Sequence, residues 1–466
     1  MSPVSSDRSN GTPRSKLRGL VRRVLGRPPV TSTAFDQPPK FDKWTDPIAP
    51  AVASSPPGPT VVMLNDCRDQ VNLGANALVE GLIAILSRSL PNATILPIPS
   101  HWLIEAEFLH TFVNDGVDLR QPRVEFPYVC DQFETVADDW MAGRGGPDVG
   151  QYLDRFAAAD LVVVNGEGSL YRRNQSAVRE LFLAWFCKTR LGVPTMFVNG
   201  SSHLTDVDPV LPPMVRKTFA ALDAVAVREP PSYRNLRHYA PDVDVKYFPD
   251  SAFVFTTGHA RETPTAQKIR DEIGPGPHFY FDPSPMPMDD RAGAASALHR
   301  MISALKGVVP RAVFVSTGPG DDYIERTARE TGSVFVRIYD YREWMSLIRD
   351  ARFLVTGRYH NVIMAAIMGI PSITFASASH KVHGACEMLE GLAGSPYDPT
   401  NLRPHLQSIE DQARSYLLNR DRLAIPLQDV CARRRAEAVG VGQLAADVIG
   451  QRAAKGLVED SKAVGD

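Results

Sequence analysis

Residues Val355–Leu389, VTGRYHNVIMAAIMGIPSITFASASHKVHGACEML, contain the pattern that decides the fold. A short β-type run ends at Thr356 and opens into the turn Gly357–His360, which leads into an apolar, helix-like run over 362–368. A second buried strand is expected over 372–375. Strand, turn, helix and strand make a βαβ unit, whose crossover is almost always right-handed. Its turn faces the carboxyl end of the sheet, where open α/β sheets bind ligands.

The turn carries two side chains that are suited to chemistry, Arg358 and His360. An arginine binds phosphates and carboxylates through its planar fork, and a histidine titrates near neutral pH. The N-terminus of the following helix also favours anions. We therefore expect an active site at this turn.

Strand-like and helix-like segments alternate over most of the chain, which predicts an α/β fold with parallel, doubly wound sheets. Two Rossmann-like domains joined by a polar linker are expected to face a cleft. The last strand of the first domain is predicted over 247–255, and a helix near the C-terminus over 402–418. The predicted organisation is a tail over 1–57, an N-terminal domain over 58–258, a linker over 259–277, a C-terminal domain over 278–395, and helices over 396–466 that pack back across the domains before a flexible end.

The composition excludes several classes of protein. Apolar residues make up 44% of the chain and charged residues 22%, as is usual for a soluble globular protein. No run of 18 apolar residues occurs, and no apolar segment of a signal peptide follows the N-terminus. The five cysteines are widely spaced and form no CxxC pair, which favours reduced thiols in the cytoplasm over a disulfide framework. The net charge is −2, and no basic stripe indicates a nucleic-acid partner.

The first 57 residues are rich in Ser, Pro and Arg and predict a disordered, basic tail. Within 1–30, seven Arg and Lys residues stand against one Asp, a local net charge of +6. The segment 14–27 can form a short helix with an apolar side and contact an anionic membrane surface from the cytoplasm. A solvated tail is the alternative, and both interpretations stay open.

Other strand ends supply candidate ligand-binding residues. Asn72 and Gly74 lie in a small-residue loop before a helix, which resembles an anion cradle. The loop NGEGSL contains Gly166, Glu167, Gly168 and Ser169, where the glycines let the backbone approach a ligand closely. Asn199 ends a further strand, and Arg228 follows the strand 224–227.

Six motifs occur in order between residues 60 and 390: NLG at 72–74, NGEGSL at 165–170, AVREPPSY at 226–233, PDSAF at 249–253, GRYHNVIMAAIMGIP at 357–371 and HKVHGACEMLE at 380–390. The set resembles the polysaccharide pyruvyl transferase family. The resemblance implies a two-domain fold like that of GT-B glycosyltransferases. It also implies transfer of the pyruvyl group of phosphoenolpyruvate to two hydroxyls of a sugar, as a cyclic ketal. The acceptor would be a glycan or glycolipid precursor of the cell envelope or an exopolysaccharide, with no cofactor besides the donor.

The resemblance implies catalytic roles for His360, Arg358 and Arg228, and substrate binding by Lys381. We expect the two arginines to clamp the two anionic ends of phosphoenolpyruvate from different domains, and His360 to act as general acid. Glu167 stands where many members have glycine, so it either repels the donor or binds a sugar hydroxyl.

Alternative interpretations remain. For Arg228, a structural ion pair with Glu229 or Asp250 competes with ligand binding. The chain could instead be a GT-B glycosyltransferase that uses a nucleotide sugar, with Glu387 as its ribose-binding carboxylate, or an inactive scaffold in a glycan-assembly complex. A metal set of His380, His383 and Glu387 does not match a zinc-protease spacing, so no metal is expected. Tyr359 is interpreted most simply as a core residue.

Overall fold

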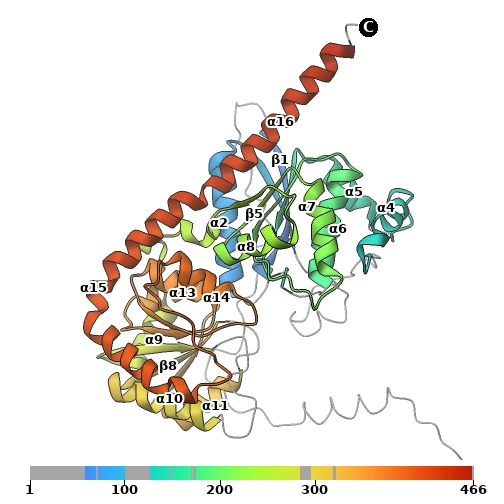
Figure 1. Ribbon diagram of the computed structural model, residues 1–466. Helices are drawn as coiled ribbons and strands as arrows, with labels where there is room; N and C mark the ends of the chain where they lie inside the picture. The colour runs from blue at the N-terminus through green and yellow to red at the C-terminus, as the bar shows by residue number, and fades with distance from the viewer. Residues whose placement is uncertain are drawn as a thin grey trace, which may run out of the picture. The chain divides into compact units, whose positions relative to one another are not determined.

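The structure of the protein is a computed structural model (Figure 1). It describes residues 58–69, 72–99, 126–146, 149–168, 170–171, 175–283, 295–317 and 322–463. All of these belong to one compact unit, Ala53–Asp466. The predicted tail over 1–57, with its candidate membrane-contacting segment 14–27, lies outside the described residues. No helix in the described ranges is long and apolar enough to cross a membrane.

Six parallel strands form the sheet of the first lobe. Their order is β2 (Thr94–Pro99), β1 (Thr60–Asp66), β3 (Leu161–Asn165), β4 (Thr195–Gly200), β5 (Ala224–Val227) and β6 (Val245–Tyr247). Alternate residues of β1 point to opposite faces, so Val62 and Leu64 pack in one core while Val61 and Met63 pack in the other. Helices α4 (Phe133–Met141), α5 (Val149–Ala157), α6 (Gln175–Thr189), α7 (Leu211–Ala221) and α8 (Pro230–Tyr239) cover the first face, and α2 (Leu73–Ser89) and α16 (Gly440–Ala463) cover the second.

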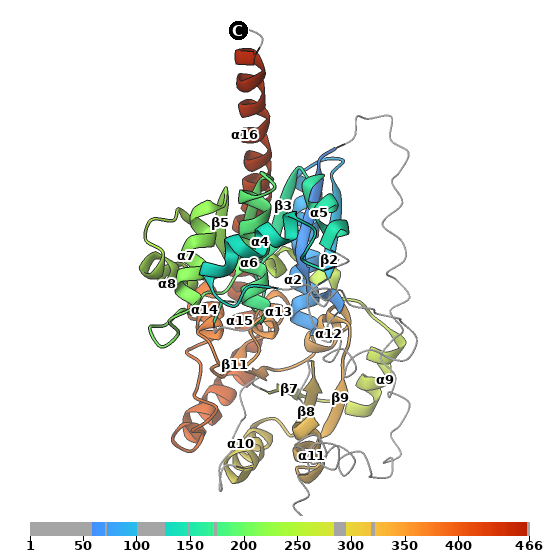
Figure 2. The same cartoon turned by 90° about the vertical axis from the view of Figure 1, so that its right-hand side faces the viewer.

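Five parallel strands form the sheet of the second lobe (Figure 2). Their order is β11 (Ser372–Thr374), β10 (Leu354–Thr356), β7 (His278–Asp282), β8 (Arg311–Ser316) and β9 (Val334–Arg337). One face is covered by α10 (Ala295–Val308), α11 (Asp322–Glu330) and α15 (Leu406–Ala438), and the other by α9 (Pro264–Ile273), α12 (Tyr341–Ile348), α13 (Tyr359–Ile367) and α14 (Lys381–Met388). Both sheets are doubly wound, as the sequence predicts.

The strand order of each sheet reverses at one point, between β1 and β3 in the first lobe and between β7 and β10 in the second. Ligands of open α/β sheets bind outside the carboxyl ends of the strands at such points. The segments that leave β1, β3 and β10 carry Asn72, Glu167 and Arg358, and β7 ends at Asp282. The topology therefore directs four strand ends toward one candidate site.

The two lobes share an apolar core beside these strand ends. Every residue of α13 is buried, as its apolar sequence predicts. The core around Tyr359 and Val362 of α13 also contains Leu73 of α2 and Phe253 of the 3-10 helix η4 (Ser251–Val254). Because this core takes side chains from both lobes, it fixes the N-termini of α2 and α13 close to one another.

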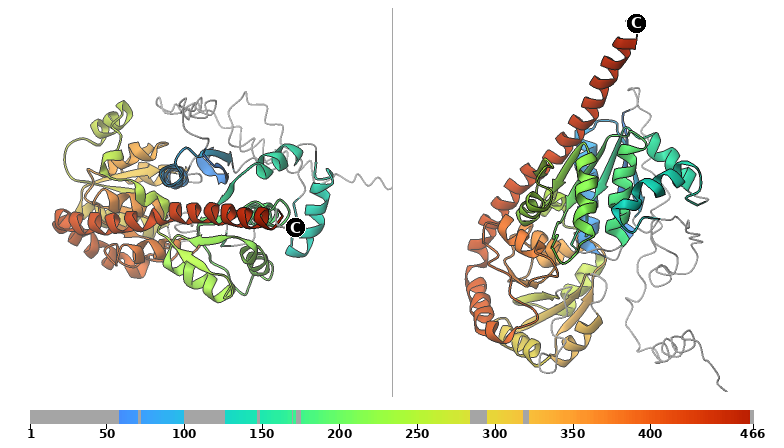
Figure 3. Two further views of the ribbon diagram at one scale, coloured as in Figure 1. Left: turned by 90° about the horizontal axis from the view of Figure 1, so that it is seen from above. Right: turned by 45° about the vertical axis from the view of Figure 1, so that its right-hand side comes forward.

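Two long helices complete the chain. Helix α15 packs against α10 and α13, and α16 packs against α2 and contacts β3 and β5 (Figures 1 and 3). The chain thus passes along the second lobe and then back to the first.

Several predicted boundaries differ from the structure. The predicted strand over 247–255 is wrong, because β6 ends at Tyr247 and η4 follows. Pro249 has no N–H for a strand ladder, and the Asp250 side chain caps η4 by accepting from the backbone N–H of Ala252 at 2.8 Å. The segment 259–277, predicted as a linker, contains α9, which packs in the core of the second lobe.

One helix and one strand also differ from the prediction. The helix predicted over 402–418 begins at Leu406 and continues to Ala438 as α15. Strand β2 was not predicted, because TILPIP contains two prolines. It lies at the edge of the sheet, where a missing N–H is tolerated.

The close packing of α16 on α2 provides a test of this fold. A Cβ added to Gly442 would collide with Ser89 and press on Ile85, whereas a Cβ on Gly450 would meet no atom. Gly442→Val should therefore lower the free energy of unfolding by about 1–3 kcal/mol through overpacking. Gly450→Ala, in the same helix, should raise it by about 0.5–1 kcal/mol. Urea denaturation measures both, and equal effects at the two positions would contradict this packing of α16.

Candidate active site

Asp282 organises the turn that carries Arg358. The carboxylate is fully buried at the end of β7 and accepts hydrogen bonds from Thr317 Oγ1 at 2.9 Å, Thr356 Oγ1 at 2.7 Å and Asn361 Nδ2 at 2.7 Å. Arg358 Nε lies 3.2 Å from the same carboxylate. Because these donors flank the start of α13, Asp282 holds both the arginine and the N-terminus of α13 in place.

The sequence analysis did not identify this network. Its members are separated by up to 79 positions, from Asp282 to Asn361. They share one signal, which is a polar side chain at or just after the carboxyl end of a predicted parallel strand. In the parallel register, Thr356 lies directly opposite Asp282.

Arg228 is the centre of a second buried network. Its guanidinium is fully buried at the end of β5 and donates to Asp250 at 3.0 Å, to Ser201 Oγ at 2.9 Å and to Glu229 at 3.3 Å. It also forms an ion pair with Glu167. A buried guanidinium needs such partners, because an unpaired charge in the interior costs several kcal/mol. Arg228 therefore binds carboxylates of the protein and does not line the cavity, contrary to the expected clamp of two arginines.

His360 connects the two networks. Its Nε2 atom lies 3.4 Å from Asp250 Oδ2 and 3.4 Å from Arg228 Nη1. On the other side of the ring, a Cβ on Gly74 would overlap with the imidazole, so only glycine allows α2 to approach this closely. The N-terminus of α2 is capped by Asn72, whose Oδ1 accepts from the N–H of Gly74 at 3.2 Å. The imidazole is thus held between the N-terminus of α2 and a buried ion cluster.

Two carboxylates of this cluster, Glu167 and Asp250, have lowered pKa values, whereas burial raises the pKa of the third, Glu229. Burial alone would raise the pKa of Glu167, but Arg228, His360 and Lys381 outweigh it and hold that pKa below its ordinary value. Burial alone would also raise the pKa of Asp250. His360 and Arg228 outweigh it, so the pKa of Asp250 is lowered as well. Both groups therefore stabilise the folded state above the unfolded pKa, and this stabilisation is lost only in acid, below about pH 4.

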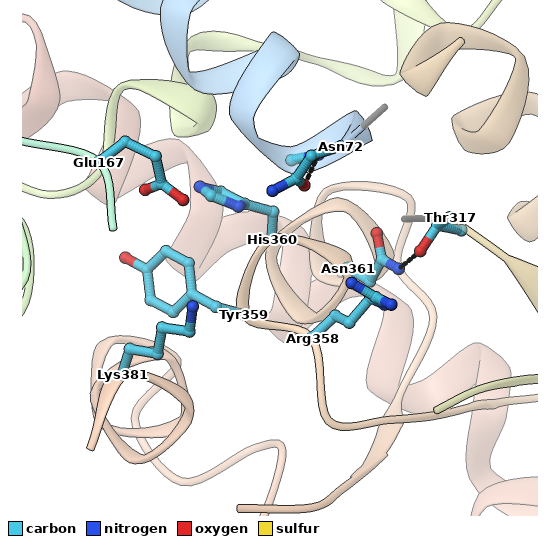
Figure 4. A pocket seen from close by; sticks show the side chains of 9 residues that line it. Asn72, Glu167, Thr317, Arg358, Tyr359, His360, Asn361 and Lys381 are labelled. Carbon is cyan, nitrogen blue, oxygen red and sulfur yellow. Dashed lines mark hydrogen bonds between the residues drawn. The ribbon is translucent and has the colours of Figure 1, made fainter. Parts of the chain in front are cut away.

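A cavity of about 40 Å³ lies between these groups. It is lined by Asn72, Gly74, Glu167, Thr317, Arg358, Tyr359, His360, Asn361 and Lys381. In Figure 4 the imidazole of His360 stands in the middle, with Glu167, Tyr359 and Lys381 on one side and Asn72, Thr317, Asn361 and Arg358 on the other. A space of this size holds about three water molecules.

Five predicted binding or catalytic residues besides His360 line this cavity. They are Arg358, Lys381, Glu167, Asn72 and Gly74. Burial lowers the pKa of Lys381, and the Glu167 carboxylate opposes that shift. The amino group of Lys381 lies on the side of His360 opposite Arg358 (Figure 4).

Gly166, Gly168 and Asn199 are described and do not line the cavity. Gly166 packs against the ring of Phe197, where a Cβ would collide, and Gly168 adopts a φ of +74° in the turn that positions Glu167. The side chain of Asn199 donates to Ser251 Oγ at 3.0 Å and is not directed at a ligand. Ser169 lies outside the described residues.

The alternative metal set is not assembled in the described part of the chain. No group of three or more His, Cys, Asp and Glu side chains there could hold a metal ion. His380 Nδ1 instead lies 2.9 Å from His203 Nδ1, and burial lowers the pKa of His380 to about 4. Glu387 forms a bidentate pair with Arg234 at 2.8 Å.

The contact between Gly74 and His360 leads to a prediction. Gly74→Ala should displace the imidazole of His360, because the added Cβ would overlap with the ring. This overpacking should lower the free energy of unfolding by about 1–3 kcal/mol. Gly307→Ala, at an exposed helical position with no atom within 4 Å of the added Cβ, is the matched control and should stabilise the protein by about 0.5–1 kcal/mol. Histidine ring NMR signals should shift only in Gly74→Ala. An unchanged His360 signal in that variant would contradict the contact.

Comparison with solved structures identifies the fold. The UDP-GlcNAc 2-epimerase from Neisseria meningitidis, bound to UDP-GlcNAc, matches with a TM-score of 0.53 at 10% identity, over 82% of this chain and 98% of that one. A sucrose-phosphate synthase from Thermosynechococcus elongatus matches with a TM-score of 0.52 at 13% identity, over 84% of this chain and 100% of that one. At these identities the likeness shows the fold alone, which is of the GT-B type.

Comparison with curated proteins found no match. The family model described as polysaccharide pyruvyl transferase matches residues 72–380. That range includes Asn72, Glu167, Arg228, Arg358 and His360, the residues around which the two networks and the cavity are built. The chain therefore belongs to the polysaccharide pyruvyl transferase family.

Proposed function

We propose that this protein transfers the pyruvyl group of phosphoenolpyruvate to two hydroxyls of a sugar, forming a cyclic ketal and releasing phosphate. The acceptor is a sugar of a glycan or lipid-linked precursor of the cell envelope or an exopolysaccharide. The reaction needs no cofactor besides the donor substrate and takes place in the cytoplasm. One observation carries the proposal: Arg358 and His360 stand together at the N-terminus of α13 and line one cavity with Lys381.

The phosphate end of the donor fits the Arg358 side of the cavity. There the guanidinium is held by Asp282, and the N-termini of α2 and α13 both face the cavity through Asn72 and His360. Two helix N-termini and one guanidinium supply positive potential that stabilises phosphate as it leaves.

His360 supplies the proton chemistry of the proposal. The first sugar hydroxyl adds to C2 of the donor and loses its proton, while C3 gains a proton. The bond from C2 to the phosphate oxygen then breaks, the second hydroxyl forms the new bond to C2, and its proton leaves with the released phosphate. A positioned imidazole serves as general acid for the proton that C3 receives, and the Asp250 carboxylate, 3.4 Å from Nε2, orients the ring.

Arg228 acts as a positioning residue in this scheme. It lies behind His360 and Glu167, holds both through the buried ion cluster and stacks 4.5 Å from the ring centroid of Tyr359. The Glu167 carboxylate is paired with this guanidinium, and the pairing reduces the repulsion between Glu167 and an anionic donor.

The alternative function is that of a glycosyltransferase that uses a nucleotide sugar. Its candidate ribose-binding carboxylate, Glu387, is not placed to bind a ligand in the cavity. Glu387 is bound by Arg234 and does not line the cavity. The shared GT-B fold permits either chemistry, so the donor must be identified by experiment.

The donor can be identified directly. Purified protein incubated with radiolabelled phosphoenolpyruvate and a panel of saccharides should transfer label to the saccharide and release an equal amount of phosphate. UDP- and GDP-sugars should transfer nothing under the same conditions. Transfer from a nucleotide sugar would overturn the proposal in favour of a glycosyltransferase, and binding of neither donor would favour a scaffold.

The role of His360 can be separated from that of Arg358. His360→Gln should lower kcat by about 100- to 10,000-fold and leave the Kd for phosphoenolpyruvate nearly unchanged, since it removes a proton transfer. Arg358→Lys keeps the charge but loses the fork and should weaken phosphoenolpyruvate binding by about 10- to 100-fold. Calorimetry and single-turnover kinetics measure the two effects. Near-wild-type turnover by His360→Gln would refute the proton role.

A further inference from the structure

Tyr359 lines the cavity and has a buried hydroxyl that is unpaired among the described residues. Tyr359 is 2% exposed, and within the described part of the chain its hydroxyl oxygen has no hydrogen-bond partner. The residue lines the cavity together with Glu167 and Lys381 (Figure 4). Buried polar groups in folded proteins almost always have a partner, so an unpaired hydroxyl on a residue that lines a cavity is available to a ligand bound there. Tyr359 is thus more than the core residue that its sequence context predicts.

The ring of Tyr359 is fixed before any ligand binds. The Arg228 guanidinium stacks over it at 4.5 Å, and the His360 ring packs edge-on against it at 4.9 Å between centroids. Tyr359 is also the first residue of α13, whose position depends on the buried Asp282 network. A hydroxyl held in this way can bind a ligand without losing further side-chain freedom.

The hydroxyl can act only as a neutral donor or acceptor. Burial, with Asp250 and Glu229 nearby, raises the pKa of Tyr359 well above its ordinary value. The phenol therefore keeps its proton at any working pH and can approach an anion without repelling it. The Lys381 ammonium lies on the same side of His360 (Figure 4).

The cavity thus has one cationic side chain on each side of the imidazole, Arg358 on one and Lys381 on the other (Figure 4). Phosphoenolpyruvate has two anionic ends, a phosphate and a carboxylate, with C2 and C3 between them. If the phosphate lies beside Arg358, the carboxylate extends toward Lys381, and the carbon atoms lie against His360.

We propose that the Tyr359 hydroxyl donates a hydrogen bond to the carboxylate of phosphoenolpyruvate, beside the Lys381 ammonium, and so distinguishes this donor from inorganic phosphate. The inference rests on the proposed function, because it concerns the same donor. It assigns the two ends of the cavity to the two ends of one molecule. Tyr359 then acts in specificity, while His360 acts in proton transfer.

The test compares two ligands on matched variants. Tyr359→Phe removes only the hydroxyl. Tyr280→Phe is the control, because Tyr280 is also fully buried with an unpaired hydroxyl among the described residues but lies outside the cavity. Tyr359→Phe should weaken phosphoenolpyruvate binding by about 10- to 100-fold, as expected for loss of a hydrogen bond to a charged group. Its affinity for inorganic phosphate should be unchanged, and Tyr280→Phe should bind both ligands like wild type.

Stability provides a second readout. Each Phe variant removes an unsatisfied buried hydroxyl, so both should keep or raise the Tm of the free protein. Lys381→Met should likewise weaken phosphoenolpyruvate binding without affecting phosphate, whereas Arg358→Lys should weaken both ligands. This pattern would support the assignment of the two ends.

Several outcomes would overturn it. If Tyr359→Phe binds phosphoenolpyruvate as tightly as the wild type does, the hydroxyl does not bind the donor. The proposed function would still stand in that case, because the wild-type protein binds phosphoenolpyruvate. An equal loss of both ligands in Tyr359→Phe would assign the hydroxyl to the phosphate end instead. Failure of the wild type to prefer phosphoenolpyruvate over phosphate would refute the proposed function itself.

Discussion

The site depends on the burial of one guanidinium among carboxylates. Arg228 lies with no exposed surface between Glu167, Asp250 and Glu229, and its removal would leave buried negative charges without a partner. Breaking a buried ion pair in this way costs about 3–5 kcal/mol, whereas the intact cluster contributes little net stability. The cluster contributes mainly by fixing the positions of side chains. The cluster fixes Glu167 and Asp250 of the first lobe relative to His360 of the second, so the imidazole has a defined position only when both lobes contribute.

The Asp282 network positions Arg358, as the Arg228 cluster positions His360. Asp282 accepts from hydroxyl groups at the ends of β8 and β10 and from the amide of Asn361 in α13, and it also lies 3.2 Å from Arg358 Nε. Both networks therefore place a carboxylate behind the group that faces the cavity. Such support restricts the rotamers of Arg358 and His360 before a ligand arrives, which is the condition for electrostatic preorganisation.

The sequence predicts the parts of this design that are local. The parallel sheets follow from alternating apolar segments, and the buried α13 and its polar turn follow from GRYHNVIMAAIM. The networks are not local. Asp282 reaches Thr356 only through the register of β7 with β10, and no sequence pattern tells whether Arg228 faces a ligand or the carboxylates beside it. Tyr359 is assigned to the core by its ring, and only the structure shows that its hydroxyl has no hydrogen-bond partner among the described residues. Sequence reading thus finds the turn that carries the chemistry and misses the buried groups that orient it.

The contacts around the cavity differ in strength on its two sides. On one side, Leu73 and Phe253 of the first lobe share an apolar core with α13, and exposing it costs about 25 cal/mol per Å². On the other side, the lobes meet through His203 and His380 and through the Arg234–Glu387 pair, whose side chains are 61% and 44% exposed. An ion pair so exposed contributes about 0–1 kcal/mol. Separating the polar contacts therefore costs less free energy than separating the apolar ones. Helix α14 carries His380 at its N-cap and Glu387, so the weaker contacts are made by the same helix that brings Lys381 to the cavity, while the apolar contact holds α2 and α13 together beside His360.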